Sequence, residues 1–179
     1  MIGLERGIVR LAPYTDEWRR SFESEKRLLE TAIGRRALGI EHVGSTSVEG
    51  LEAKPIIDVA VAVRRLSDGE ECVGALRQVG YEYKGENGLP TQRFFVKGEP
   101  RRTHCLHVVE IDGDEWRNYL LFRDYLRHNR DVMEAYAQLK RDLAQQYATN
   151  RGAYTEAKAA FIARVIASAQ EVERRGGGG

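Results

Sequence analysis

Residues 44–58 contain the side chains whose types and spacing could do chemistry. Gly44, Ser45 and Thr46 form a small, hydroxyl-rich turn directly after an apolar run that is typical of a strand. If a short helical segment follows the turn, its free backbone N–H groups and the positive end of its dipole would suit a bound phosphate. Small-residue turns after strands also occur without any ligand, so the turn by itself leaves both interpretations open.

Asp58 is the single acid in the apolar run of residues 56–63. A carboxylate there is costly to bury unless a cation or a hydrogen-bond donor meets it. The strand carries Asp58 back toward the edge of the sheet where the turn lies, so carboxylate and phosphate cradle could converge. Because Mg²⁺ prefers one or two carboxylates together with phosphate oxygens, Asp58 is a candidate metal ligand. A structural salt bridge from Asp58 to Lys54 or Arg93 is the alternative.

The run HCLHVVEI, residues 104–111, holds two further candidates. In a regular strand His107 points to one face of the sheet and Glu110 to the other, so both line one pocket only if a bulge or the strand end intervenes. His107 could be a general base, a metal ligand, a phosphate donor or a hydrogen-bonded histidine of the sheet. Glu110 could be a metal ligand or a solvated side chain at the end of the strand.

Several cations could bind an anionic substrate. Arg93 stands in an apolar strand, where a cation needs a partner, and its guanidinium fork matches phosphate or carboxylate groups. Arg123 and Arg127 are four residues apart in FRDYLR, which an ordinary salt-bridged helix also explains. Tyr154 and Lys158 have the same spacing at the start of the last expected helix and could reach the edge of the sheet.

The hydrophobic pattern predicts a mixed sheet followed by helices. An amphipathic helix is expected to begin at Thr15 or Asp16 and to end near Gly34, and the β-branched run 56–63 predicts a strand buried on both faces. The other expected strands span residues 37–43, 81–84, 92–97 and 104–111, and the other expected helices span residues 67–79, 114–126, 131–147 and 155–173.

Composition excludes some classes of function. The chain has 179 residues with a net charge of +1, so no global basic field attracts nucleic acid or a membrane. Its cysteines, Cys72 and Cys105, match no metal or redox spacing. The N-terminus lacks the apolar core of a signal peptide, and no apolar run is long enough to span a bilayer. We therefore expect a cytoplasmic protein with reduced thiols.

The sequence HVGSTSVEGLEAKPIIDVAV, residues 42–61, resembles the signature of the GrpB family, which has the nucleotidyltransferase fold. The resemblance extends over residues 9–169 and includes the runs RFF, LHVVE, FRDYLR and AYTEAKAAFI. It implies that Gly44 and Ser45 hold nucleotide phosphates and that Asp58 binds the metal. The wider superfamily usually has a second acid two positions later, where this chain has Ala60.

The same resemblance implies an α+β fold, with a nucleotidyltransferase-like mixed β-sheet, flanking helices and a C-terminal helical segment. We expect residues 1–113 to form the nucleotidyltransferase-like core and residues 114–175 to form helices packed on it. The four glycines at residues 176–179 are expected to be a flexible tail.

The resemblance further implies an Mg²⁺-dependent enzyme that passes a nucleotidyl group from a nucleoside triphosphate to a small acceptor. Because Ala60 removes one of the usual metal ligands, a non-catalytic nucleotide- or anion-binding module on the same fold is the alternative. The residues expected in these roles are Asp58, Glu110 and His107 for catalysis, with Asp58 and Glu110 as metal ligands; Gly44, Ser45, Thr46, Lys54 and Arg93 for the nucleotide; and Arg123, Tyr154 and Lys158 for the acceptor.

Overall fold

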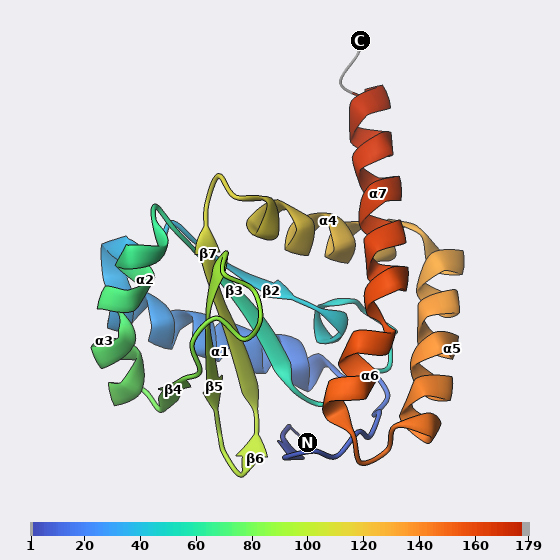
Figure 1. Ribbon diagram of the computed structural model, residues 1–179, viewed down its shortest axis with the longest axis horizontal. Helices are drawn as coiled ribbons and strands as arrows, with labels where there is room; N and C mark the ends of the chain where they lie inside the picture. The colour runs from blue at the N-terminus through green and yellow to red at the C-terminus, as the bar shows by residue number, and fades with distance from the viewer. Residues whose placement is uncertain (1, 177–179) are drawn as a thin grey trace.

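A five-stranded mixed sheet in the order β2-β3-β7-β5-β4 lies at the centre of the protein (Figure 1). The structure is a computed structural model and describes residues 2–176. β3 and β7 are parallel, and the other neighbouring pairs are antiparallel. The strands of this sheet are β2 (Gly39–Val43), β3 (Ile57–Val63), β4 (Tyr81–Tyr83), β5 (Gln92–Lys97) and β7 (His104–Glu110), and a separate pair joins β1 (Leu4–Glu5) to β6 (Arg101–Arg102).

The strand register brings the residues that follow β2 to the start of β3. These two strands are antiparallel, and Val43 lies opposite Asp58. On the other side of β3, Asp58 pairs with Cys105 of β7, and Ala60 pairs with His107. Because side chains alternate between the faces of a strand, Asp58 and His107 point to the same face of the sheet. The predicted convergence of turn and strand acid is confirmed.

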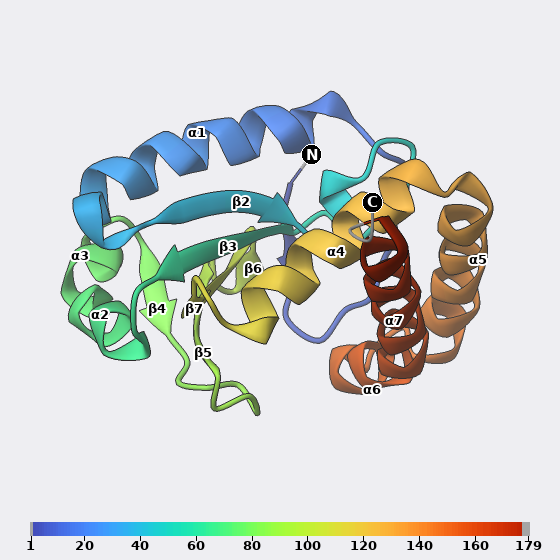
Figure 2. The same ribbon diagram turned by 90° about the horizontal axis from the view of Figure 1, so that it is seen from above.

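Helix α1 (Asp16–Ile33) covers the opposite face of the sheet (Figure 2). Its bounds agree with the prediction because its ends are set by local chemistry. The side chain of Thr15 accepts a hydrogen bond from the backbone N–H of Glu17 at 3.3 Å, and Gly34 ends the helix with a φ of 54° that favours glycine.

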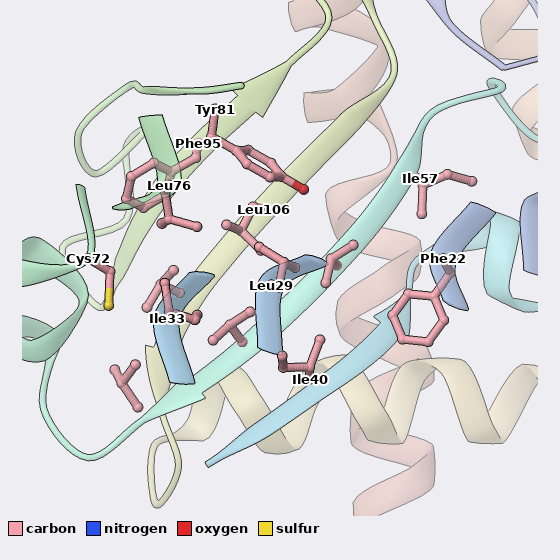
Figure 3. Packing of buried hydrophobic residues seen from close by; sticks show 14 of the residues in the cluster. Phe22, Leu29, Ile33, Ile40, Ile57, Cys72, Leu76, Tyr81, Phe95 and Leu106 are labelled. Atoms are coloured by element: carbon pink, nitrogen blue, oxygen red, sulfur yellow. The ribbon is translucent and has the colours of Figure 1, made fainter. Parts of the chain in front are cut away.

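The main hydrophobic core lies between α1 and the sheet (Figure 3). Alternate residues of β3 point into this core, and those between them point to the other face, which is also covered by helices. This double coverage is why β3 is apolar along nearly its whole length. Core members include Trp18, Leu29, Ile57, Leu76, Phe95 and Leu106.

Two short helices, α2 (Leu66–Glu71) and α3 (Val73–Gln78), replace the single helix predicted over residues 67–79. The break falls at Cys72, which ends one helix and begins the next. Gly69 and Gly74 lie on either side of it, and glycine lowers helix propensity by about 1 kcal/mol. Gly69 also permits close packing, because a Cβ at this position would lie 2.8 Å from Val108 on the sheet.

Four helices follow the sheet: α4 (Asp114–His128), α5 (Arg130–Gln146), α6 (Arg151–Ala157) and α7 (Ala159–Gly176). The third helix predicted in this region is therefore two helices, divided at Lys158. Gly176 is the last residue of α7, and residues 177–179 of the predicted tail lie outside the described residues. Within residues 2–176, no helix has the length and apolar character needed to cross a membrane.

Helix α4 joins this helical segment to the sheet. It packs on the face of the sheet opposite α1 (Figure 2). This is the face that carries Asp58 and His107, and a small residue of β2 allows the helix to come close. A Cβ at Gly39 would lie 2.9 Å from the ring of Trp116 and 3.7 Å from the Cβ of Ala62 on β3. Beyond α4, a second apolar cluster joins α4, α5 and α7 to Val48 and Leu51, which follow the turn after β2.

Candidate functional site

A cavity of about 730 Å³ opens where the end of β2, the start of β3 and helix α6 meet. Its wall combines segments that are far apart in the sequence. Among the residues that line it are Ser45, Thr46, Lys54, Asp58, His107, Tyr154 and Lys158, all of which were predicted as site residues. The structure thus brings together most of the predicted nucleotide- and acceptor-binding residues around Asp58.

The turn after β2 lies directly against Asp58. Gly44 has a φ of 70°, and a Cβ at this position would stand 2.7 Å from the Oδ2 atom of Asp58. The hydroxyl of Ser47 donates to the carbonyl of Gly44 at 2.6 Å, and the Nε2 atom of His42 lies 2.9 Å from the hydroxyl of Thr46. The turn is therefore held in one conformation, with the hydroxyl residues Ser45 and Thr46 at the cavity wall.

Asp58 remains ionised at neutral pH, and about a third of its side chain (35%) is accessible to the cavity. Burial acts to raise its pKa, but the hydrogen bond and charge of His107, together with the charges of Lys54 and Lys158, outweigh burial and lower the pKa below its usual value. The Oδ1 atom of Asp58 lies 3.5 Å from Nε2 of His107. Its observed partner is therefore His107, and neither Lys54 nor Arg93 of the predicted salt bridge forms an ion pair with it within residues 2–176.

His107 is oriented by two residues that the sequence did not single out. Its Nδ1 atom lies 3.1 Å from Oε1 of Gln92 and 3.1 Å from the hydroxyl of Tyr119, which donates to the same Gln92 oxygen at 3.3 Å. These contacts fix the ring so that Nε2 faces Asp58.

Two lysines approach one aromatic ring in the cavity. The Nζ atoms of Lys54 and Lys158 lie 4.9 Å and 4.5 Å from the centre of the Tyr154 ring. Burial and then the nearby charge of Lys54 lower the pKa of Lys158 to about 7, and burial also lowers the pKa of Lys54. Neither ammonium group forms an ion pair with a carboxylate in the part of the chain that the structure describes.

Lys140 is a third cation at the cavity and was not predicted. Its side chain is 1% exposed, its Nζ donates to the carbonyl of Glu52, and it lies 4.9 Å from the centre of the Tyr136 ring. Burial and the charge of Lys158 lower its pKa to about 7. One feature of the sequence points to Lys140: it lies on the apolar side of α5, four residues after Tyr136. A lysine is rarely buried at such a position unless its charge has a polar partner.

Glu110 and Arg93 are not brought to this cavity. Glu110 pairs with Val63 at the far end of β3, and its Oε1 atom accepts from the backbone N–H of Leu66 at 3.1 Å. Arg93 points to the face covered by α2, where its Nε donates to Glu70 at 2.8 Å. Strand alternation explains both positions, because His107 and Phe94, which pair across β7 and β5, point to the opposite face.

Arg123 also lies outside the cavity wall. Its Nη1 atom donates to Glu41 at 2.7 Å and to the carbonyl of His42 at 3.1 Å, while its Nε donates to Asp124 at 2.7 Å. These contacts bind α4 to the end of β2. Arg123 thus stabilises the strand that precedes the turn. This agrees with the alternative that its spacing allowed, an ordinary salt-bridged helix.

The side chains around Asp58 do not fit an Mg²⁺ ion held by the protein itself. Within residues 2–176, no group of three or more His, Cys, Asp or Glu side chains is arranged to hold a metal ion. Ala60 occupies the position of the second acid, is 0% exposed, and contributes no ligand. Asp58 is the remaining carboxylate and already lies among the charges of Lys54 and Lys158, whereas Mg²⁺ requires several oxygen ligands.

Comparison with known proteins agrees with this architecture. The chain is 38% identical over 171 residues to the glutamate-rich protein GrpB of Alkalihalophilus pseudofirmus, covering 93% of this chain and 98% of that protein. The crystal structure of conserved protein GrpB from Enterococcus faecalis matches with a TM-score of 0.85 and 36% identity, over 92% of this chain and 99% of that one.

A more distant likeness shows the fold alone. The structure of Cid1 in complex with the UTP analog UMPNPP matches with a TM-score of 0.51 and 16% identity, over 81% of this chain and 48% of that one. The expected nucleotidyltransferase-like fold is thereby confirmed. The family model described as GrpB protein matches residues 8–168, and the chain belongs to the GrpB family.

Proposed function

We propose that this protein binds a nucleoside triphosphate by its phosphates in the cavity around Asp58. The observation that carries the proposal is the pair of ammonium groups, Lys54 and Lys158, that face one cavity without carboxylate partners within the described residues. Burying two like charges near each other costs free energy, as their lowered pKa values indicate. A bound polyphosphate would offset this cost.

The turn after β2 would complete the phosphate site. Ser45 and Thr46 line the cavity with hydroxyl groups, and Gly44 lets the backbone come close to Asp58. Bound phosphate oxygens would accept from these hydroxyls and from the two ammonium groups. The likeness of the fold to Cid1, which was solved with a UTP analog, supports a nucleotide as the source of the phosphates.

The second candidate function is transfer of the nucleotidyl group to a small acceptor, and the contact between Asp58 and His107 favours it. An acceptor hydroxyl oxygen would attack the α-phosphorus, the bond from this phosphorus to the β-phosphate oxygen would break, and pyrophosphate would leave. The proton of the acceptor would pass to Asp58 or His107. Because the donor set does not fit a protein-held metal, we propose that any Mg²⁺ enters with the nucleotide phosphates.

Calorimetric titration with ATP and with UTP, each with and without Mg²⁺, tests the binding proposal. We expect Lys54→Gln and Lys158→Gln each to weaken binding by about tenfold or more, since each removes a charged donor. Lys84→Gln is the matched control, because Lys84 pairs with Glu82 outside the cavity. Absence of nucleotide binding by the unmodified protein, or an equal loss in Lys84→Gln, would overturn the proposal.

Pyrophosphate release with a panel of small hydroxyl acceptors tests the transfer step. We expect release that Asp58→Asn abolishes while the calorimetric affinity for ATP is retained within a few-fold. Metal-independent nucleotide binding without release from any acceptor would instead identify a binding module, the outcome that Ala60 favours.

A further inference from the structure

A second group of cations lines the same cavity and takes no part in the proposed nucleotide site. This second group, the arginine group, consists of Arg102 and Arg151. Arg6 lies exposed at the rim of the cavity. In the order of the strands, the turn at Gly44 follows β2, and Arg102 precedes β7. Asp58 on β3 therefore lies between the turn and the arginine group.

Arg102 shares the cavity wall with Asp58. Its Nε and Nη2 atoms donate to Oε1 of Glu99 at 3.0 Å and 2.7 Å. Cys105, three residues later, is the register partner of Asp58 and also lines the cavity. Arg102 therefore lies next to the start of the strand that pairs with β3 at Asp58.

Arg151 is fixed rigidly but has an unused donor. Its Nη2 atom donates to the carbonyl of Glu5 at 2.7 Å and to those of Leu4 and Ile8 at 3.4 Å each. Its Nε atom is buried and has no hydrogen-bond partner among residues 2–176. Burial and then the charge of Arg102 lower the pKa of Arg151, and both side chains line the same cavity. A buried donor of this kind is destabilising unless a ligand accepts from it.

Positive charge exceeds negative charge around the whole cavity. Glu99 neutralises Arg102 in part, and Glu156 is an exposed carboxylate at the wall. The charges of Arg151 and Arg102 act on the pKa of Lys54, as does that of Asp58. Positive charge therefore extends from the lysines to the arginine group. A single triphosphate at the lysines would leave the arginine group without an anionic partner beyond Glu99.

We propose that Arg102 and Arg151 form a second phosphate-binding subsite, which holds a phosphate group of the molecule that meets the nucleotide at Asp58. This inference rests on the proposed function for the position of the nucleotide, and it assigns the acceptor to the class of phosphorylated small molecules. Guanidinium groups suit this role because each carries five N–H donors, so donors remain for phosphate oxygens beyond those that Glu99 and the backbone carbonyls occupy. The location between two phosphate sites would place Asp58 at the point where donor and acceptor meet.

Titration of the full chain with inorganic phosphate, followed through the side-chain Nε–H resonances of Arg102 and Arg151, tests the subsite. We expect a saturable shift of both resonances. In Arg102→Gln the Arg151 shift should require about tenfold more phosphate, since one charged donor pair is lost. Arg102→Lys, which keeps the charge without the fork, should fall between the two.

Arg101→Gln is the matched control, because Arg101 is the neighbouring residue on β6 and donates to the carbonyl of Gly3 away from the cavity. It should leave the phosphate titration unchanged. Absence of a saturable shift in the unmodified protein, or an equal loss of affinity in Arg101→Gln and Arg102→Gln, would overturn the subsite. Circular dichroism of each variant confirms that the fold is retained.

The same titration separates this inference from the nucleotide site. In a Lys54→Gln, Lys158→Gln double variant, ATP binding should be lost, while the arginine resonances should still respond to phosphate. With the unmodified protein saturated by ATP, a persisting phosphate response identifies a separate phosphorylated acceptor. Loss of the response shows that the nucleotide itself supplies the phosphate at this subsite. The persisting response supports the proposal, and its loss overturns the assignment of the subsite to the acceptor.

Discussion

Gly44 and Asp58 are in such close contact that no side chain fits between them. A Cβ at position 44 would stand 2.7 Å from Oδ2 and 3.1 Å from Cβ of Asp58, and the backbone φ of 70° is one that side chains disfavour. The turn at Gly44 and the carboxylate of Asp58 are therefore packed so tightly that a shift of the turn must move the carboxylate.

Gly44→Ala tests this contact between the turn and Asp58. We expect a loss of about 1–3 kcal/mol of stability from backbone strain and, because Asp58 is displaced, a loss of ATP affinity. Gly34→Ala is the control, since Gly34 also has a positive φ, but a Cβ there would have no atom within 4 Å. Urea unfolding and calorimetry should show that both variants are less stable and that the one at position 44 alone loses affinity. Unchanged affinity in Gly44→Ala would contradict the contact.

The affinity of the cavity for anions should fall as pH rises from 6 to 9. The pKa of Lys158 is lowered to about 7, so its ammonium form is present below this pH and is lost above it. A bound anion favours the charged form and shifts the loss to higher pH. Sulfate is the suitable probe in calorimetry because its own charge is constant over this range. Lys140, whose pKa is also lowered to about 7, shares the cavity and contributes to the same slope. Lys158→Arg should therefore bind with a flatter pH profile and keep the part due to Lys140, and an equally steep profile in this variant would refute the role of Lys158.

His107 should control the ionisation of Asp58. In His107→Phe the ring can still pack against Phe94 and Tyr119, whose centroids lie 5.1 Å from it. The hydrogen bond and charge that lower the pKa of Asp58 are removed, so its carboxyl ¹³C resonance should titrate at higher pH than in the unmodified protein.

The depressed pKa of Asp58 stabilises the fold above the unfolded pKa, and this contribution is lost as pH falls through the folded pKa. The difference in stability between His107→Phe and the unmodified protein should therefore shrink on acidification from pH 7 to pH 3. His128→Phe is the control, since His128 is exposed and its Nδ1 atom bonds to the carbonyl of Asp124 outside the cavity. An unchanged Asp58 titration in His107→Phe would contradict the assignment.

Ala60→Asp should create a pair of carboxylates for a metal ion, where residues 2–176 offer no group of three or more ligands. Ala60 is fully buried and lies on the face of β3 that carries Asp58, so an unpaired carboxylate there should cost about 2–4 kcal/mol. Millimolar Mg²⁺ should then raise the melting temperature of this variant and leave that of the unmodified protein unchanged. Ala60→Asn provides the uncharged control. An equal rise in the unmodified protein would show that Asp58 binds the ion with other ligands.

Local patterns in the sequence predict much of this fold. The caps at Thr15 and Gly34 define α1 because each satisfies backbone groups within a few residues. The apolar run around Asp58 predicts β3 because a strand covered on both faces needs such a run. The convergence of Gly44 with Asp58 follows from the return of one strand beside the other.

The remaining features depend on contacts between distant segments. Strand alternation separates His107 from Glu110, but the face of Arg93 becomes known only from the register between β5 and β7. Gln92 and Tyr119 meet at His107 because α4 lies across the sheet, and no spacing in the sequence encodes that contact.

The hydrogen bonds from Arg151 to the carbonyls of Leu4, Glu5 and Ile8 join helix α6 to the N-terminal segment at the cavity wall. The last strand of the central sheet ends at Glu110, whereas Arg151 and Lys158 follow much later. During synthesis on a ribosome, the strands are therefore all made before the cavity can close. A ligand that contacts Arg151 and Lys158 therefore depends on residues that are made well after the sheet is complete.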